Sequence, residues 1–323
     1  MQTLQFLTVL PAPNSSAHRS HSDGCKFFTT FLQPTVLFQR HKFTESNMAG
    51  KACRPLQATA HPPDVMYRRD ERKNFTLDDI RQVLIRLEDS IIFNLLERAQ
   101  YSYNGGAYDN GAFFQDGFQG SLVTYMVQET EKLHAKVGRY KSPDENPFFP
   151  GYLPVPKLPP MRYPEVLHHS AASININDKI WNVYFIDLLP RLAKEGGDGN
   201  WGSSTVCDTL CLQALSKRIH YGKFVAEAKF QESPREYAAA IEAKDRKRLM
   251  EMLTFEKVEA QVKERVEWKA RRYGETIRVT ENSEGSDPVY KMKPSLVANL
   301  YGDWIMPLTK EVEVEYLLRR LDD

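Results

Sequence analysis

A helical repeat of apolar residues is the feature that most constrains the fold of this chain. Between residues 80 and 99, apolar side chains recur at spacings of three and four, as on the buried face of a long amphipathic helix. Thr76-Leu77-Asp78-Asp79 resembles a capping box, so we expect the helix to begin there. Asn104-Gly105-Gly106 is predicted to end it. The repeat consists of Ile80, Val83, Leu84, Leu87, Ile91, Ile92, Leu95, Leu96 and Ala99.

The helical pattern continues through most of the remaining chain, whereas alternating strand patterns are almost absent. Loops are expected at residues 142–164, which hold eight prolines, at the glycine-rich 196–202 and at the polar 279–288. The predicted fold class is therefore all-α, a multi-helix single domain over residues 70–323 with almost no β structure. Further helices are expected over 121–135, 180–192, 204–230, 244–253, 258–273 and 294–321, with another opened by Ser233-Pro234 and an interruption at Pro307. Core positions of the 204–230 helix should be Leu210, Leu212, Leu215, Ile219 and Val225.

Composition argues against several classes of protein. No stretch approaches about 18 uninterrupted apolar residues, so a membrane-spanning helix is not expected. The net charge of +1 argues against a general nucleic-acid binder. Cys207 and Cys211 are four residues apart, which suits one helix face, and no histidine pair lies near them at zinc-ligand spacing. We interpret them as buried, reduced thiols and expect no bound metal.

The first 60 or so residues differ from the rest of the chain. They are rich in Ser, Thr, His and Pro, and Asp23 and Glu45 are their only acidic residues. An acid-poor, hydroxyl-rich and basic start is typical of an organelle transit peptide, so residues 1–65 are predicted to be a transit or disordered segment. Two further cysteines, Cys25 and Cys53, fall within it. The alternative is a disordered tail without a targeting function, and composition alone does not separate plastid from mitochondrial targeting.

Charged and polar residues on otherwise apolar helix faces indicate where a ligand could bind. If such residues converge, two guanidinium groups and an ammonium group would suit a small dianion, because arginine holds a carboxylate in a bidentate fork. The alternative is that they form ordinary surface ion pairs. The chain shows no nucleophile elbow, phosphate loop or dinucleotide fingerprint. Three pairs share helix faces: Arg81 with Glu88, Arg218 with Lys229, and Thr309 with Glu313.

Four longer segments resemble the eukaryotic chorismate mutase family, and the plant-type, plastidial members most of all. The resemblance spans about residue 76 to the C-terminus. The segments are Arg81-Gln-Val-Leu-Ile-Arg-Leu-Glu-Asp-Ser-Ile-Ile-Phe, Lys141-Ser-Pro-Asp-Glu-Asn-Pro-Phe-Phe-Pro, Leu215-Ser-Lys-Arg-Ile-His-Tyr-Gly-Lys-Phe-Val-Ala-Glu-Ala-Lys and Pro307-Leu-Thr-Lys-Glu-Val-Glu-Val-Glu-Tyr-Leu-Leu-Arg-Arg-Leu.

The resemblance implies a reaction and a set of residues for it. Members of the family convert chorismate to prephenate by a Claisen rearrangement, without a cofactor or a covalent intermediate. Arg81 and Arg218 match the positions that bind the two substrate carboxylates. Lys229 matches the residue that reaches the ether oxygen and a carboxylate. Glu313 would donate a hydrogen bond to the same oxygen if it is protonated, as a carboxyl group among apolar neighbours can be.

Two further positions complete the implied catalytic set. Glu259 would accept a hydrogen bond from the ring hydroxyl group, and Thr309 would line the pocket. Phe255 departs from the fungal pattern, which has a polar residue there, so that contact is absent or comes from the backbone. Lys310 would oppose protonation of Glu313 if it pointed inward.

The family also carries an effector site for aromatic amino acids at the interface of a homodimer. The matching positions are Gly138 and Arg139 together with Asn200, Trp201, Gly202 and Ser203. Fungal members have two arginines where this chain has Gly138 and Arg139, and a threonine in place of Val206. The plant pattern implies inhibition by phenylalanine and tyrosine, activation by tryptophan, and location in the plastid stroma, with the cytosol as the alternative. A non-catalytic sensor of aromatic amino acids and a helical scaffold without a ligand are the other functions considered.

Overall fold

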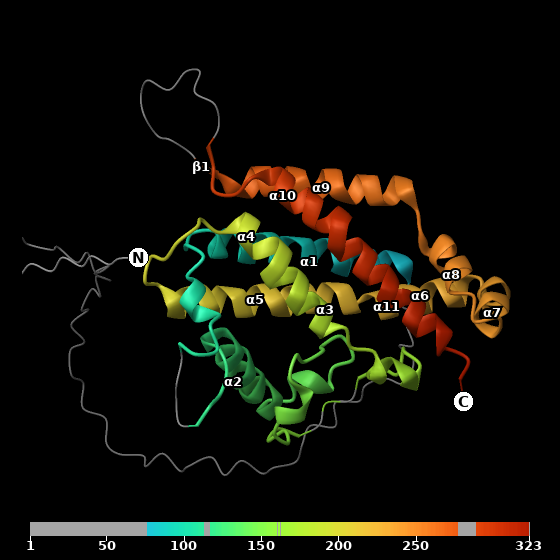
Figure 1. Ribbon diagram of the computed structural model, residues 1–323. Coiled ribbons are helices and arrows are strands. Elements are labelled where there is room, and N and C mark those ends of the chain that lie inside the picture. The colour runs from blue at the N-terminus through green and yellow to red at the C-terminus, as the bar shows by residue number, and fades with distance from the viewer. Residues whose placement is uncertain (1–75, 113–116, 160, 162, 277–288, 323) are drawn as a thin grey trace, which may run out of the picture. The chain divides into compact units, whose positions relative to one another are not determined.

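The computed structural model describes residues 76–323 except 113–116, 160, 162, 277–288 and 323. The described residues belong to one compact unit, Val65–Asp323. The first 65 residues, with Cys25 and Cys53, and the whole of the polar 279–288 segment therefore lie outside the described residues. Figure 1 shows that the unit is built almost entirely of helices, as the periodicity predicts. The helices are α1 (Leu77–Arg98), α2 (Leu122–Lys136), α3 (Asn177–Asn182), α4 (Leu189–Leu192), α5 (Trp201–His220), α6 (Gly222–Glu232), α7 (Pro234–Glu242), α8 (Arg246–Leu253), α9 (Glu256–Gly274), α10 (Pro294–Leu300) and α11 (Met306–Leu318).

Short elements connect the α-helices. The named strands form a two-residue antiparallel ladder, β1 (Glu275–Thr276) with β2 (Val289–Tyr290), and an isolated parallel bridge joins Ser102 to Lys194. Two π-helical segments, Val183–Leu188 and Tyr301–Ile305, join α3 to α4 and α10 to α11. Four 3₁₀ turns lie at Gly105–Ala107, Arg139–Lys141, Pro150–Tyr152 and His169–Ser173. Apart from one such turn, the described part of the proline-rich 142–164 segment is irregular, as expected.

α1 begins where the sequence predicts and ends earlier. The Thr76 hydroxyl oxygen accepts a hydrogen bond from the Asp79 N–H, and the Asp79 carboxylate accepts one from the Thr76 N–H, which completes the capping box. The helix ends at Arg98, six residues before Asn104. Asn104 adopts a left-handed conformation (φ 55°), but it precedes a 3₁₀ turn instead of closing α1. Thus the start of α1 was predicted correctly and its end was not.

The predicted 204–230 helix is two helices, because the chain turns at Tyr221 between α5 and α6. α5 starts at Trp201, inside the segment expected to be a loop. The prediction that Leu210 is a core residue is wrong, since 47% of its surface is exposed. The buried face of α5 passes through Asp208, Cys211 and Leu212, and Leu210 points away from that face.

The other core predictions for α5 and α6 are mostly confirmed. Leu212, Leu215 and Ile219 are buried, and Val225 is half-buried. The predicted burial of the two thiols holds for Cys211, whereas Cys207 is only half-buried; both are free.

The interruption expected at Pro307 takes the form of a wider helical turn. Pro307 has no N–H group and would clash with the carbonyl group one turn earlier in a regular α-helix. The π-helical segment Tyr301–Ile305 precedes it, so the chain passes from α10 to α11 without leaving helical structure.

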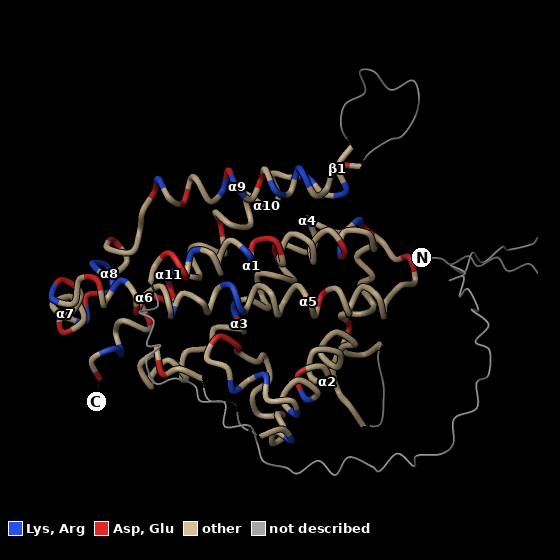
Figure 2. The backbone as a smooth tube through the Cα atoms, turned by 180° about the vertical axis from the view of Figure 1, so that it is seen from behind, with Lys and Arg blue, Asp and Glu red and all other residues tan. Residues whose placement is uncertain are grey.

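The long helices pack side by side around one main core. α5 packs against both α1 and α2, α9 against α10, and α6 against α11. Figure 2 shows charged residues of both signs along α9, in keeping with the mostly exposed surface of that helix. Among the described helices, none is both long and apolar enough to cross a membrane. The described residues also contain no cluster of three or more His, Cys, Asp or Glu side chains that could hold a metal ion.

Candidate active site

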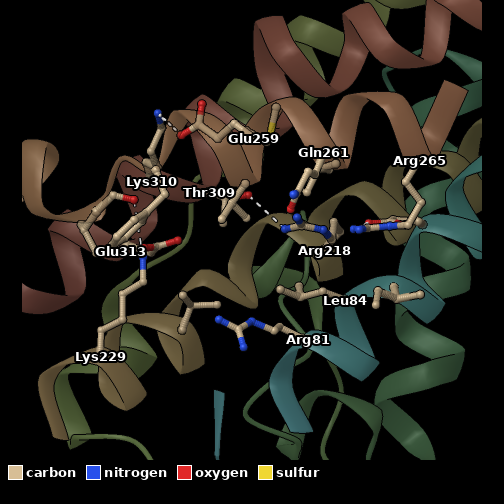
Figure 3. A pocket seen from close by; sticks show the side chains of 18 residues that line it. Arg81, Leu84, Arg218, Lys229, Glu259, Gln261, Arg265, Thr309, Lys310 and Glu313 are labelled. Carbon is tan, nitrogen blue, oxygen red and sulfur yellow. Dashed lines mark hydrogen bonds and ion pairs between the residues drawn. The ribbon is translucent and has the colours of Figure 1, made fainter. Parts of the chain in front are cut away.

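A cavity of about 410 Å³ lies between α1, α5, α6, α9 and α11. The volume falls in the range of sites that bind small molecules. Figure 3 shows side chains from several of these helices pointing into it. All six residues of the implied catalytic set line this one cavity: Arg81 on α1, Arg218 on α5, Lys229 on α6, Glu259 on α9, and Thr309 and Glu313 on α11.

Gly222, the first residue of α6, brings α6 close to α11. A Cβ atom at this position would lie 2.8 Å from the Thr309 carbonyl oxygen and 3.3 Å from the Glu313 Cγ atom. Any side chain larger than hydrogen would therefore separate the two helices. The close approach lets Lys229 of α6 and Glu313 of α11 meet at one end of the cavity.

Arg218 is a buried cation with unused hydrogen-bond donors. Only 5% of its surface is exposed. Its Nη1 atom donates to the Thr309 hydroxyl oxygen at 3.3 Å, and that hydroxyl group donates to the Ile305 carbonyl oxygen at 2.6 Å. Its Nε–H has no hydrogen-bond partner within the described structure. A buried guanidinium group with free donors is poised to bind an anion.

Arg81 and Glu88 share a face of α1 as predicted, but their surroundings differ. Arg81 is exposed at the edge of the cavity and pairs with Asp78 at 2.6 Å. Glu88 is buried and accepts hydrogen bonds from Nε and Nη2 of Arg265, at 2.9 and 2.6 Å, and from Lys269 at 3.1 Å. Arg265 lines the cavity, and sequence reasoning did not identify it. The two partners are 177 positions apart, so no local pattern links them.

Lys229 and Glu313 form a buried pair, with Nζ 3.3 Å from a carboxyl oxygen of Glu313. Burial raises the pKa of the Glu313 carboxyl group above its usual value, and the positive charge of Lys229 opposes the shift. Lys229 also lies 5.0 Å from the centre of the Phe255 ring and 3.5 Å from the Leu253 carbonyl oxygen. A backbone acceptor is thus present beside Phe255.

Lys310 is engaged with other groups. Its ammonium group pairs with Glu259 at 2.8 Å and donates to the Thr254 hydroxyl oxygen at 3.3 Å. It still contributes to lowering the Glu313 pKa, but less than Lys229 does. The carboxylate of Glu259 is held at the cavity wall by this pair.

The implied effector residues do not meet within one chain. Arg139 pairs with Glu145 at 2.9 Å and donates to the side-chain oxygen of Gln213 at 2.9 Å. Gly202 and Ser203 are exposed in the first turn of α5, and Asn200 precedes it. Ser203 and Gln213 are ten residues apart on α5, which is about 15 Å along the helix axis.

The region before α5 is nevertheless well ordered by hydrogen bonds. The Asp198 carboxylate accepts from the Ser102 N–H at 2.7 Å, the Asn104 side-chain amide at 3.0 Å and the Asn200 N–H at 2.9 Å. Gly138 has a φ of 81°, which favours glycine, and it links the end of α2 at Lys136 to the 3₁₀ turn that begins at Arg139.

Comparison with known proteins identifies the family of this chain. Residues 202–314 match the family model described as chorismate mutase type II. Chorismate mutase 1, chloroplastic, of Petunia hybrida is 65% identical over 94% of this chain and 97% of its own length. Crystal structures of AtCM1 with phenylalanine or tyrosine bound in the allosteric site are 66% identical, with a TM-score of 0.71 over 78% of this chain and 99% of theirs. The Aro7p chorismate mutase of Candida albicans in complex with L-Trp is 41% identical, with a TM-score of 0.73 over 77% of this chain and 93% of its own. Since the Petunia enzyme is so similar along almost its whole length, this chain belongs to the chorismate mutase family.

Proposed function

We propose that the cavity between α1, α5, α6, α9 and α11 is the active site in which this chorismate mutase converts chorismate to prephenate. In this rearrangement the ether C–O bond breaks and a C–C bond forms within the same molecule. The enzyme therefore accelerates it by holding the compact conformer and by stabilising charge as the ether bond lengthens. The observation that carries the proposal is the buried Arg218, with free donors, in the same cavity as the Lys229–Glu313 pair.

The two substrate carboxylates would bind to Arg218 and Arg81. Arg218 offers its Nε–H and the remaining guanidinium donors to one carboxylate in a buried position, where a charge-assisted hydrogen bond is strong. Arg81 is held only by an exposed pair with Asp78, which contributes little energy. Arg81 can therefore exchange Asp78 for the second carboxylate when the substrate enters.

The ether oxygen would receive hydrogen bonds from Lys229 and Glu313. Negative charge builds up on this oxygen as its bond to the ring carbon lengthens, so donors stabilise the transition state more than the substrate. The raised pKa of Glu313 favours the protonated carboxyl group that can donate such a bond. Lys229 supplies a positive charge next to it.

The remaining groups would orient the ring. Glu259 is fixed by Lys310, and its carboxylate can accept a hydrogen bond from the ring hydroxyl group. Thr309 keeps Arg218 in place through its hydroxyl oxygen. At the position of Phe255, the Leu253 carbonyl oxygen takes the place of the polar side chain found in fungal members.

Purified protein tests this proposal directly. Loss of the ultraviolet absorbance of chorismate should be catalysed by the chain alone, without added metal or cofactor. No turnover by folded protein would contradict the proposed function.

We further propose that an effector site for phenylalanine, tyrosine and tryptophan forms between two copies of this chain. Arg139 and the first turn of α5 lie too far apart to bind one amino acid within a single chain, whereas a twofold interface can bring Arg139 of one protomer to Gly202 and Ser203 of its partner. Arg139 would hold the carboxylate of the amino acid. The allosteric sites named in the AtCM1 structures and the L-Trp complex of Aro7p support this proposal.

Rates measured with and without each amino acid test the effector site. We expect inhibition by phenylalanine and tyrosine, activation by tryptophan, and a dimer in solution. Arg139→Ala should bring the ratio of the rates with and without effector close to one for all three amino acids. An unchanged ratio in this variant, or full regulation of a monomer, would contradict the proposed site.

Residues 1–65 are proposed to direct the protein to the plastid stroma. The acid-poor composition and the chloroplastic names of the relatives support this location. Import of the full chain into isolated chloroplasts, with removal of an N-terminal segment and protection from added protease, is the expected result. Retention of the uncleaved chain outside the organelle would favour the cytosol instead.

A further inference from the structure

A second cavity, of about 430 Å³, is rich in positive charge and separate from the active site. It is lined by the end of α4 and residues 193–194, by β2 and the residues after it, and by α10. Figure 1 shows α4 and β1 at one end of the helical unit and α6 and α8, which border the active site, at the other. The cavity shares no lining residue with the active site.

Four cationic side chains line this cavity. They are Arg191, Lys194, Lys291 and Lys293. The lining residues that the structure describes include no carboxylate. In the part of the chain that the structure describes, none of the four forms a salt bridge, and Arg191 only stacks over the Trp304 ring at 5.0 Å. Like charges gathered in one place repel each other, and an anion placed among them removes that repulsion.

Backbone hydrogen bonds anchor the two segments that carry Lys194 and Lys291. The Lys194 carbonyl oxygen accepts a hydrogen bond from the Tyr103 N–H at 2.7 Å, and the Lys291 N–H donates to the Gly274 carbonyl oxygen at 2.9 Å. These bonds tie the two segments to the loop that follows α1 and to the last residue of α9. The chain thus fixes the backbone from which these exposed cationic side chains extend, which lowers the entropy lost on binding.

The floor of the cavity is apolar. Leu192 and Met292 are buried and Leu296 is half-buried, while Ser295 and Asn299 add polar groups from α10. An apolar floor below a cationic rim matches a ligand that is both flat and multiply charged. We propose that this cavity is a second binding site, for a small organic polyanion such as an aromatic polycarboxylate.

Two methionines allow each cavity to be observed separately. Met292 lines the second cavity and Met306 lines the active site. Protein labelled at the methionine methyl groups would be titrated with benzene-1,2,4-tricarboxylate, and with citrate as a non-aromatic anion of similar charge, while NMR follows the methyl signals. Met292→Leu and Met306→Leu identify the two signals. We expect the Met292 signal to shift and saturate, with citrate binding about fivefold more weakly because it covers less apolar surface.

Charge variants decide whether the cavity itself binds the probe. Lys291→Ala combined with Lys293→Ala should weaken the saturation of the Met292 signal about tenfold. The matched control, Lys157→Ala with Lys247→Ala, removes the same charge from exposed positions outside the cavity and should change it less than about twofold. Movement of the Met306 signal alone, equal weakening by both double variants, or saturation unaffected by Lys291→Ala with Lys293→Ala would overturn the proposed site. Citrate binding as tightly as the aromatic probe would overturn the proposed ligand class.

Discussion

Replacement of Gly222 by alanine tests whether the close packing of α6 on α11 shapes the active site. The new Cβ atom would lie 2.8 Å from the Thr309 carbonyl oxygen and 3.1 Å from its Cγ2 atom. The carbonyl belongs to the backbone of α11 and cannot swing away, so one helix must shift by several tenths of an ångström. Overpacking of this kind costs about 1–3 kcal/mol, and the better helix propensity of alanine returns up to about 1 kcal/mol. We expect a net loss of about 1–2 kcal/mol in the free energy of unfolding.

The same shift would displace Thr309 and Glu313, so kcat should fall about tenfold. Urea unfolding and the chorismate absorbance assay measure the two effects. Gly302→Ala is the matched control, because its Cβ atom would meet only the flexible end of the Lys263 side chain, at 3.1–3.3 Å. We expect the control to change the unfolding free energy by less than about 0.5 kcal/mol and to keep full activity. A Gly222→Ala enzyme with normal stability and normal kcat would refute the packing argument.

Three other variants test charged groups inside the fold. Burial raises the pKa of Glu313, so kcat/KM that depends on its protonated form should fall as the pH rises through that pKa. Glu313→Gln should lose this fall, because its amide donates a hydrogen bond at every pH. A fall that persists in the variant would count against Glu313 as the hydrogen-bond donor. Burial lowers the pKa of Lys223 from 10.5 to about 8, so the unfolded chain binds more protons between these values and stability should rise with pH there. At pH 7 the lowered pKa costs about 3 kcal/mol of stability, and the hydrogen bond from Lys223 to Asn146 returns about 1 kcal/mol. Lys223→Met should therefore raise the free energy of unfolding by about 2 kcal/mol at pH 7 and by less near pH 10. An unchanged urea midpoint at pH 7 would disprove this. Arg98→Met leaves Asp208 buried without its partner at 2.6 Å and should cost about 3–5 kcal/mol, partly restored by Asp208→Asn in the same chain; a loss below about 1 kcal/mol would contradict the importance of the pair.

Much of the fold could be predicted because helix periodicity and capping are local signals. The capping box at Thr76 and the apolar face of α1 depend on residues within a few turns of one another. The same reasoning correctly put Thr309 and Glu313 on one face, since four residues complete about one helical turn. Both residues line the cavity.

Features that depend on distant residues could not be predicted from the pattern. Arg218 and Lys229 do reach the same cavity, but from two helices separated at Tyr221 and not from one. Leu210 lies in an apolar run, and only the packing of neighbouring helices decides that it faces outward. The pairing of Arg265 with Glu88 joins α9 to α1, which no spacing in the sequence reveals.

Turnover by Arg218→Ala is the most direct test of the central claim that this cavity performs the rearrangement. The assay follows chorismate absorbance, while circular dichroism and urea unfolding establish that the variant is folded. Arg272→Ala, an exposed arginine on α9 outside the cavity, serves as the control. The Arg218→Ala variant lacks the buried guanidinium group that would bind the negative charge of the substrate and the transition state. Its kcat/KM should fall by about 10²–10³-fold or more, whereas that of the control should not change. Normal turnover by folded Arg218→Ala would contradict the proposed active site.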